Sequence, residues 1–169
     1  MKKYFATLIL SSFVALGSLA GCGGESEQTE TTKTPVTDTQ TNHDPDDVAL
    51  TPEQIKALED GIADYSDALT KIKSFRDTIR DSVAAGKPSK AHRPLDELDV
   101  ILNHLPQVAR DSNIPKSDWE AVNTTAQQVR DLFNKVHADI DSGNEPDYTS
   151  VSDGIDKAIE TLDGIQPAE

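Results

Sequence analysis

The chain has 169 residues, of which 36% are hydrophobic, and it carries a formal net charge of −14. Such an acidic chain lacks the basic surface with which proteins bind nucleic acid, and it lacks the polybasic segments that hold a protein flat on anionic lipid. We therefore expect no nucleic-acid partner. About 120 residues remain once the N-terminal leader and the polar stretch behind it are set aside, which is enough for one domain with a single core.

The first residues resemble the signal peptide of a bacterial lipoprotein. Two lysines follow Met1, an apolar run extends to about Leu16, and Leu19-Ala20-Gly21-Cys22 has the form of a lipobox. The apolar run is shorter than the roughly 20 residues that span a bilayer. The resemblance implies that residues 1–21 are a lipoprotein signal peptide, that cleavage precedes Cys22, and that acyl chains such as palmitate are attached to this residue.

Cys22 is the only cysteine of the chain, so no intrachain disulfide can form. Two or more acyl chains on it would give stable anchoring to a membrane. In the sorting pattern of lipoproteins from diderm bacteria, a residue other than Asp after the cysteine favours the outer membrane, and Gly23 stands there. We expect a protein anchored in the cell envelope, on the outer membrane and facing the periplasm. The alternative is ordinary cleavage that leaves Cys22 unmodified.

Residues 22–50 are expected to form a disordered, acidic, Thr-rich linker behind the lipidated cysteine. This stretch contains almost no large apolar side chains, so it cannot offset the entropy lost on ordering. A flexible chain of this length reaches roughly 30 Å. The linker would hold the folded domain, residues 51–169, away from the lipid headgroups.

The domain is predicted to open with a long helix that starts at Thr51-Pro52-Glu53-Gln54, a capping box with Pro52 at the first helical position. Apolar residues then follow at the spacing of one helix face, at Ile55, Leu58, Ile62, Tyr65, Leu69, Ile72, Phe75, Ile79 and Val83. Gly86 and Pro88 end the pattern. This helix would have about nine turns if it is unbroken.

Three further segments show apolar residues at helical spacing. They begin at Pro94, at a second capping box, Ser117-Asp118-Trp119-Glu120, and near Thr149. Pro106 is expected to kink the first of them, because it has no N–H to donate to the carbonyl of Leu102. No segment alternates as a β-strand would. Four amphipathic segments with short connections predict an all-α fold, an antiparallel up-down four-helix bundle.

An exported bundle of this kind is similar in architecture to cytochromes b562 and c-prime, over roughly residues 51–166. The c-prime pattern needs Cys-x-x-Cys-His, but the only cysteine is Cys22. The b562 pattern needs a Met on the first helix and a His on the last, but Met1 is the only methionine and the fourth segment has no His. The resemblance therefore implies a fold and no haem ligand, and we expect no cofactor.

Three histidines of the domain could still hold a metal ion or a haem. His104 and His137 lie at the edges of the second and third apolar stripes, and His92 lies beside a helix start. Histidines in such places are more often boundary or capping residues than ligands. The segment from His92 to Leu98 could hold a cation or dock a partner, or it could contain only a local Arg93–Glu97 pair. The Glu-x-x-His motif of di-iron bundles does not occur.

The connection between the third and fourth segments partly matches a calcium-binding loop. Its carboxylates stand at positions 1, 3, 7 and 9 of that loop, at Asp139, Asp141, Glu145 and Asp147. The match is incomplete, because Asn144 replaces the expected Gly and Ser150 replaces the expected Glu. The alternative is an acidic surface turn with Gly143 as the helix cap.

The sequence contains no recognisable catalytic motif. There is no Gly-x-Ser-x-Gly element, no phosphate-binding Gly-x-x-x-x-Gly-Lys loop, and no cysteine in residues 51–169. We therefore expect a non-enzymatic, lipid-anchored binding or scaffold module with a protein partner in the envelope. The alternative is a periplasmic haem- or metal-binding bundle that uses His92, His104 or His137.

Overall fold

A computed structural model of the chain describes residues 48–168, and every regular element among them is helical. The elements are α1 (Pro52–Asp60), α2 (Tyr65–Ala84), the 3₁₀ turn η1 (Pro88–Ala91), α3 (His92–Asp111), the 3₁₀ turn η2 (Lys116–Asp118), α4 (Trp119–Asp141) and α5 (Thr149–Asp163). The expected all-α fold is thus confirmed over the described residues. The lipobox with Cys22 and the linker up to residue 47 lie outside them.

The long first helix of the sequence pattern is broken into α1 and α2. Gly61 caps the end of α1, and Asp64 has an extended backbone that begins α2. The Asp64 side chain accepts a hydrogen bond of 2.8 Å from the backbone N–H of Asp67, and the Asp67 carboxylate accepts one of 3.0 Å from the N–H of Ala63. This reciprocal cap starts a new helix in the middle of a continuous apolar pattern.

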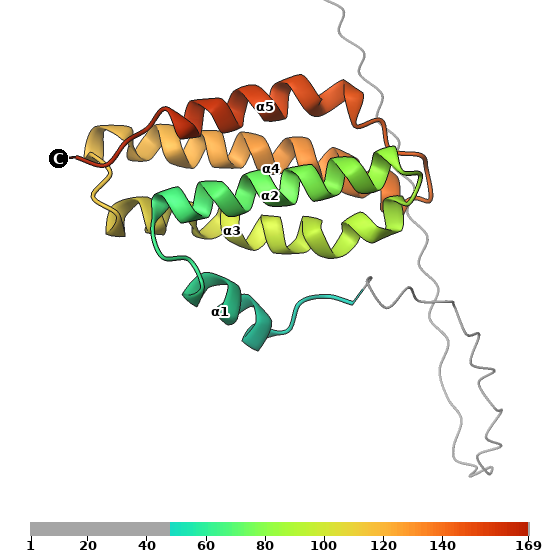
Figure 1. Ribbon diagram of the computed structural model, residues 1–169, viewed down its shortest axis with the longest axis horizontal. Helices are drawn as coiled ribbons and strands as arrows, with labels where there is room; N and C mark the ends of the chain where they lie inside the picture. Colours follow the sequence, from blue (N-terminus) through green and yellow to red (C-terminus); the bar gives the residue numbers. More distant parts are fainter. Residues whose placement is uncertain (1–47, 169) are drawn as a thin grey trace, which may run out of the picture. The chain divides into compact units, whose positions relative to one another are not determined.

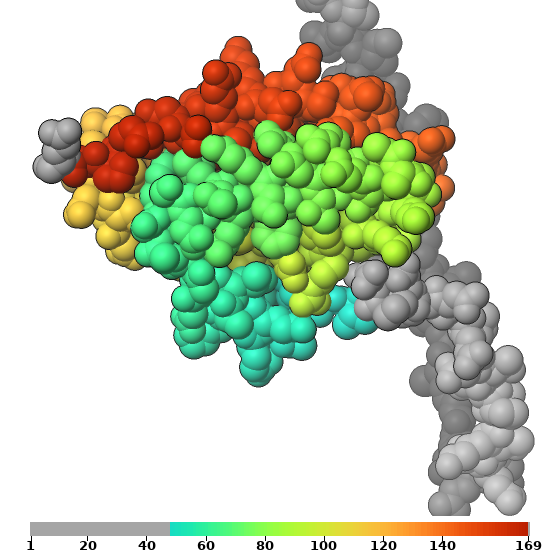
Figure 2. All heavy atoms as spheres, viewed as in Figure 1, coloured from blue at the N-terminus to red at the C-terminus, as the bar shows by residue number. Residues whose placement is uncertain are grey.

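The four long helices α2–α5 lie side by side, as Figure 1 shows. α2 packs on α3, α3 on α4, α4 on α5, and α5 returns to α2. The loops that join consecutive helices lie at alternate ends of the group. α1 lies outside this group, against α3, and Figure 2 shows it as a separate ridge on the molecular surface.

Apolar residues of α2, α3, α4 and α5 form the core. The whole stripe of α3 is buried: Leu95, Leu98, Ile101, Leu102, Leu105, Val108 and Ala109. In contrast, no residue of α1 is buried, and its apolar side chains Ile55 and Leu58 are only half-buried. Full burial of one such side chain stabilises a fold by about 1.5–3 kcal/mol, so α1 is held much less firmly than its neighbours.

Two of the expected helix starts differ from the structure. The second capping box does not form, because Ser117 already lies within η2 and α4 begins only at Trp119. The indole Nε1 of Trp119 instead donates a hydrogen bond of 2.9 Å to the carbonyl of Ile114. α3 begins at His92 rather than Pro94, because η1 leads directly into it, and it continues through Pro106.

The other two expected helix starts are confirmed. The first capping box is present, with Gln54 N–H bonded to the Thr51 hydroxyl at 3.3 Å and Thr51 N–H bonded to the Gln54 side chain at 2.9 Å. α5 begins at Thr149, as predicted. Among residues 48–168, no helix is long and apolar enough to span a bilayer.

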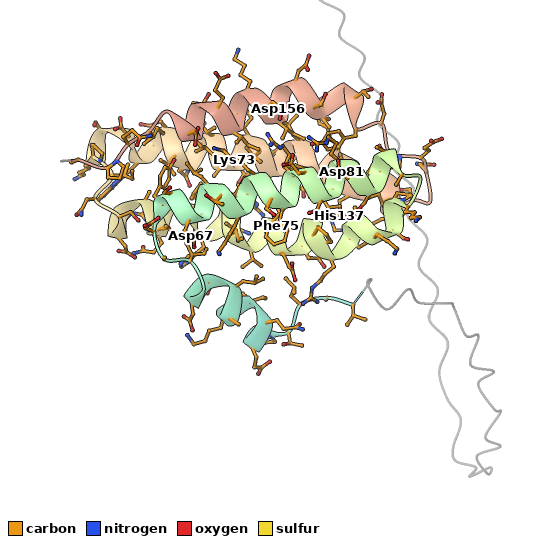
Figure 3. The ribbon with its side chains drawn as sticks, viewed as in Figure 1. Asp67, Lys73, Phe75, Asp81, His137 and Asp156 are labelled. Carbon is orange, nitrogen blue, oxygen red and sulfur yellow. The ribbon has the colours of Figure 1, made fainter. Side chains whose placement is uncertain are left out.

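Charged side chains surround this core and join neighbouring helices. Lys73 of α2 reaches Asp163 of α5 at 2.6 Å, and Arg76 reaches Asp156 of α5 at 3.0 Å. Figure 3 labels Lys73 of α2 and Asp156 of α5. Exposed ion pairs of this kind contribute about 0–1 kcal/mol each, so they fix the order of neighbours more than they stabilise the fold.

Candidate functional site

Two of the three candidate histidines lie against each other. His92 is the first residue of α3, and His137 lies one turn before the end of α4. Their ring centroids are 5.3 Å apart and the rings meet edge to face, with an interplanar angle of 73°. The start of α3 and the end of α4 therefore form one place where two imidazoles converge.

A carboxylate completes this group. Asp141 follows His137 by one helical turn, and its Oδ1 lies 3.5 Å from Nδ1 of His92 and 3.5 Å from Nε2 of His137. The exposed fraction of the side chains rises from 11% for His92 to 28% for His137 and 57% for Asp141. We refer to His92, His137 and Asp141 as the histidine cluster, which is rooted in the protein on one side and open to solvent on the other.

Asp96 lies close enough to the histidine cluster to interact with it electrostatically. It follows His92 by one turn of α3, and burial raises the pKa of its carboxyl group, while the charges of His137 and His92 oppose that rise. The local chemistry is thus two imidazoles with one exposed and one partly buried carboxyl group.

His104 does not belong to this group. It lies 12 residues after His92 on the same helix, which separates the two by about 18 Å along the axis. Its Nδ1 is 3.8 Å from the Glu59 carboxylate of α1, so His104 faces the contact between α1 and α3.

The packing of His92 and His137 bears on the haem alternative. A haem held by two histidines occupies a flat slot between the two rings. Here the edge of one ring touches the face of the other, which leaves no such slot. The arrangement favours a small ion over a haem.

The four carboxylates of the partial calcium motif are not brought together. Asp139 and Asp141 lie in the last turn of α4, and Asp141 turns to the histidines. Asp147 instead accepts hydrogen bonds from the Thr149 hydroxyl at 2.6 Å and the Ser150 N–H at 3.2 Å, and these bonds lower its pKa. Asp147 thus anchors the first turn of α5, while Glu145 is exposed.

The local pair suggested by the sequence near His92 does form. Nε of Arg93 lies 2.7 Å from Oε1 of Glu97, one turn further along α3. This pair does not engage His92, whose imidazole reaches across to α4. The local pair expected in this segment is therefore present.

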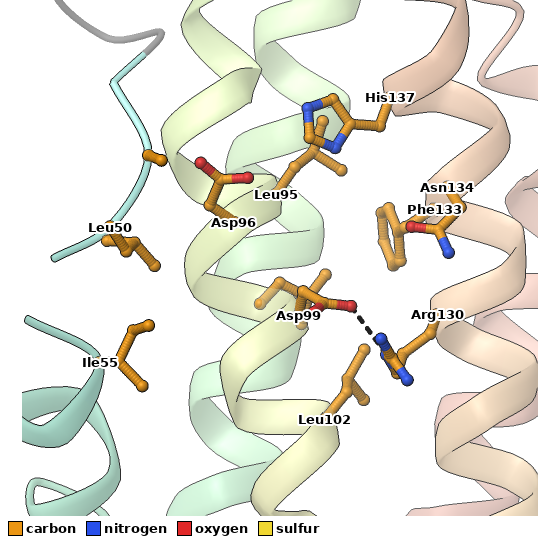
Figure 4. A pocket seen from close by; sticks show the side chains of 12 residues that line it. Leu50, Ile55, Leu95, Asp96, Asp99, Leu102, Arg130, Phe133, Asn134 and His137 are labelled. Atoms are coloured by element: carbon orange, nitrogen blue, oxygen red, sulfur yellow. Dashed lines mark hydrogen bonds and ion pairs between the residues drawn. The ribbon is translucent and has the colours of Figure 1, made fainter. Parts of the chain in front are cut away.

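A groove lies between the chain before α1, α1 itself and the faces of α3 and α4 (Figure 4). Its volume is about 390 Å³, and its lining residues are Ala49, Leu50, Ile55, Leu95, Asp96, Leu98, Asp99, Leu102, Arg130, Phe133, Asn134 and His137. Asp99 and Arg130 pair across it at 2.7 Å. Apolar side chains and polar or charged groups share this lining almost equally. His137 belongs to both the groove and the histidine cluster.

The sequence analysis missed this groove, because it placed α1 and α2 on one stripe that faced the bundle. The aspartates at positions 64 and 67 were the signal that could have revealed it, since Asp with a second acidic residue three positions later resembles a helix start. Once α1 is detached from α2, its half-buried face lies against α3 and a hollow remains beside it.

Comparisons with known proteins give no relative: no family model, no curated protein and no solved structure matches this chain.

Proposed function

We propose that this chain is a non-enzymatic binding module of the cell envelope, anchored by lipid on Cys22. The leader with its lipobox supports the anchor, and the polar residues 22–50 supply a linker long enough to present the domain to partners. The placement on the outer membrane rests on Gly23. The observation that carries the binding role is the groove beside α1.

We further assign α2–α5 to the antiparallel up-down class of four-helix bundles. The cyclic order of helix contacts and the loops at alternate ends support this assignment. α1 would then be an addition to the bundle, and the groove a consequence of that addition.

The chemistry of the groove favours a protein partner that inserts an apolar side chain. Its floor is built from buried leucines of α3 and from Phe133 of α4, and burial of one large apolar side chain is worth about 1.5–3 kcal/mol. Asp96 and the net charge of −14 favour a basic residue beside that anchor. The occupant is therefore an apolar anchor flanked by positive charge.

The anchor is tested by the change Cys22→Ser, followed by fractionation of the cells. We expect the altered chain to leave the membrane fraction, because no acyl chain can then be attached. Retention of the altered chain with the membranes in full amount would overturn the anchor and leave the groove hypothesis standing.

The groove is tested by photo-crosslinking in cells. A photoreactive residue at Asn134, which is exposed and lines the groove, should form an adduct with a discrete partner. The same probe at Lys157, exposed on α5, is the matched control and should not. Adding Leu50→Glu to the Asn134 probe should abolish the adduct, because it places a charge in the apolar wall. An adduct that survives Leu50→Glu, or that forms equally from Lys157, contradicts the groove as the binding site.

A further inference from the structure

We propose that the histidine cluster, His92, His137 and Asp141, binds one divalent transition-metal ion of the zinc type. This inference does not depend on the proposed docking role of the groove. It rests on the geometry and donor chemistry at the meeting point of α3 and α4.

The separations of Asp141 from the two histidines fit the spacing between ligands of one metal ion. Oδ1 of Asp141 lies 3.5 Å from each histidine nitrogen, whereas N–H···O hydrogen bonds measure about 2.7–3.2 Å. A tetrahedral ion with bonds of about 2.0–2.2 Å holds neighbouring ligand atoms roughly 3.3–3.6 Å apart. The two measured separations equal that edge. The three ligand atoms all lie within 4.8 Å of one another.

The donor set selects the kind of ion. Two imidazole nitrogens and one carboxylate oxygen suit Zn²⁺ and its neighbours, whereas Ca²⁺ and Mg²⁺ prefer six or more oxygen ligands. Three protein ligands leave a fourth position for water or an external group. Asp141 is exposed, so water can reach an ion bound there.

The helices α3 and α4 fix the relative positions of the three ligands. His137 and Asp141 are four residues apart on α4, which sets them one above the other on one helix face. His92 is held by burial at the start of α3, where only 8% of the residue is exposed. Two partly buried ligands and one exposed ligand leave the site accessible to an ion from solvent.

The negative charge of the surroundings also favours a cation. Asp96 lines the groove together with His137, and the chain as a whole carries a net charge of −14. Two neutral imidazoles and one carboxylate would leave a bound divalent ion with one uncompensated positive charge, which acidic surroundings stabilise.

The test is a Zn²⁺ titration of the full chain, purified in detergent and freed of metal with a chelator. Calorimetry should show one ion bound per chain, and the thermal midpoint followed by circular dichroism should rise with Zn²⁺ because the ion binds only the folded state. Co²⁺ should replace Zn²⁺ and give the visible absorption of a tetrahedral nitrogen- and oxygen-ligated centre.

Three variants locate the site. His137→Gln and Asp141→Asn should each weaken Zn²⁺ binding by at least about tenfold. Asp141→Asn is the safer variant, because Asp141 is exposed and its replacement leaves the core intact. His104→Gln is the matched control, since it removes a histidine of the same domain outside the cluster, and it should bind Zn²⁺ as the parent does. Absence of a saturable one-to-one site, or equal binding by all three variants, would overturn the proposal.

Discussion

The hydroxyl of Tyr65 donates a hydrogen bond of 3.1 Å to the carbonyl oxygen of Leu162. This bond joins the first turn of α2 to the last turn of α5, although the two residues are 97 positions apart. The backbone N–H of Tyr65 also donates to the Ser112 hydroxyl at 2.9 Å, just behind α3. Burial raises the pKa of Tyr65 well above its usual value. Tyr65 therefore links α2 to the end of α3 and to the end of α5 by hydrogen bonds.

We expect Tyr65→Phe to lower the free energy of unfolding by about 1–2 kcal/mol. The ring and its packing remain, so the loss reports the buried hydrogen bond and the carbonyl of Leu162 left without its donor. Urea denaturation followed by circular dichroism measures the change. A variant as stable as the parent would show that water replaces the hydroxyl at this carbonyl.

The cap between α1 and α2 should make stability depend on pH through Asp67. The hydrogen bond from Ala63 N–H lowers the pKa of Asp67, and Lys71 lowers it further. Because the folded pKa is depressed, the stabilisation is present above the unfolded pKa of about 3.9 and is lost as the pH falls through the folded value.

Asp67→Asn should therefore lower the unfolding free energy by about 0.5 kcal/mol near neutral pH, and the difference from the parent should vanish in strong acid. Urea denaturation at a series of pH values measures both effects. A difference that persists unchanged at about pH 2 would show that the carboxylate charge at Asp67 contributes nothing.

Two glycines should respond to alanine with opposite signs. Gly154 lies inside α5, where a Cβ would meet Cδ1 of the half-buried Leu132 at 3.2 Å, a contact that a small movement of Leu132 relieves. Gly154→Ala should stabilise the chain by about 0.5–1 kcal/mol through helix propensity. Gly143 has a φ of +69°, so Gly143→Ala should destabilise it by about 1 kcal/mol. Thermal unfolding of each variant, compared with the parent, shows whether the substitution raises or lowers stability.

α1 should detach without unfolding the rest. Leu58 is half-buried and no residue of α1 is buried, so Leu58→Ser should free α1 while the core keeps its contacts. Hydrogen exchange read by mass spectrometry should show faster exchange at residues 52–60 and unchanged protection in α3 and α4. Leu105→Ser, in the fully buried stripe, is the control and should speed exchange throughout. Uniform acceleration by Leu58→Ser would show that α1 and the bundle unfold as one unit.

The helices were largely predictable from the sequence because apolar spacing reports burial wherever a helix lies within a group of helices. In α3 every residue of the predicted stripe is buried. The same spacing did not reveal the break before Tyr65, because Leu58, Ile62 and Tyr65 keep a helical register across it. The chain breaks between α1 and α2 because Asp64 and Asp67 form local capping hydrogen bonds. These bonds involve polar side chains, so hydrophobic periodicity does not report them.

The candidate site was predictable only in part. The sequence identified His92 and His137 as candidates, but their meeting requires the start of α3 and the end of α4 to lie at the same end of the group. His104 lies midway along α3, so it does not belong to the histidine cluster at the start of that helix. Asp141 was assigned to a calcium loop. Its place beside His137 follows only from the fact that α4 continues to Asp141, which puts the two residues one helical turn apart.

The weak attachment of α1 has a mechanical consequence. α1 precedes α2 in the chain, so a pull applied from the N-terminal side reaches α1 before it reaches α2. Nine residues without a buried side chain yield under less force than a core helix. Because Leu50 and Ile55 supply one wall of the groove, stretching the chain would remove that wall while the bundle stayed intact.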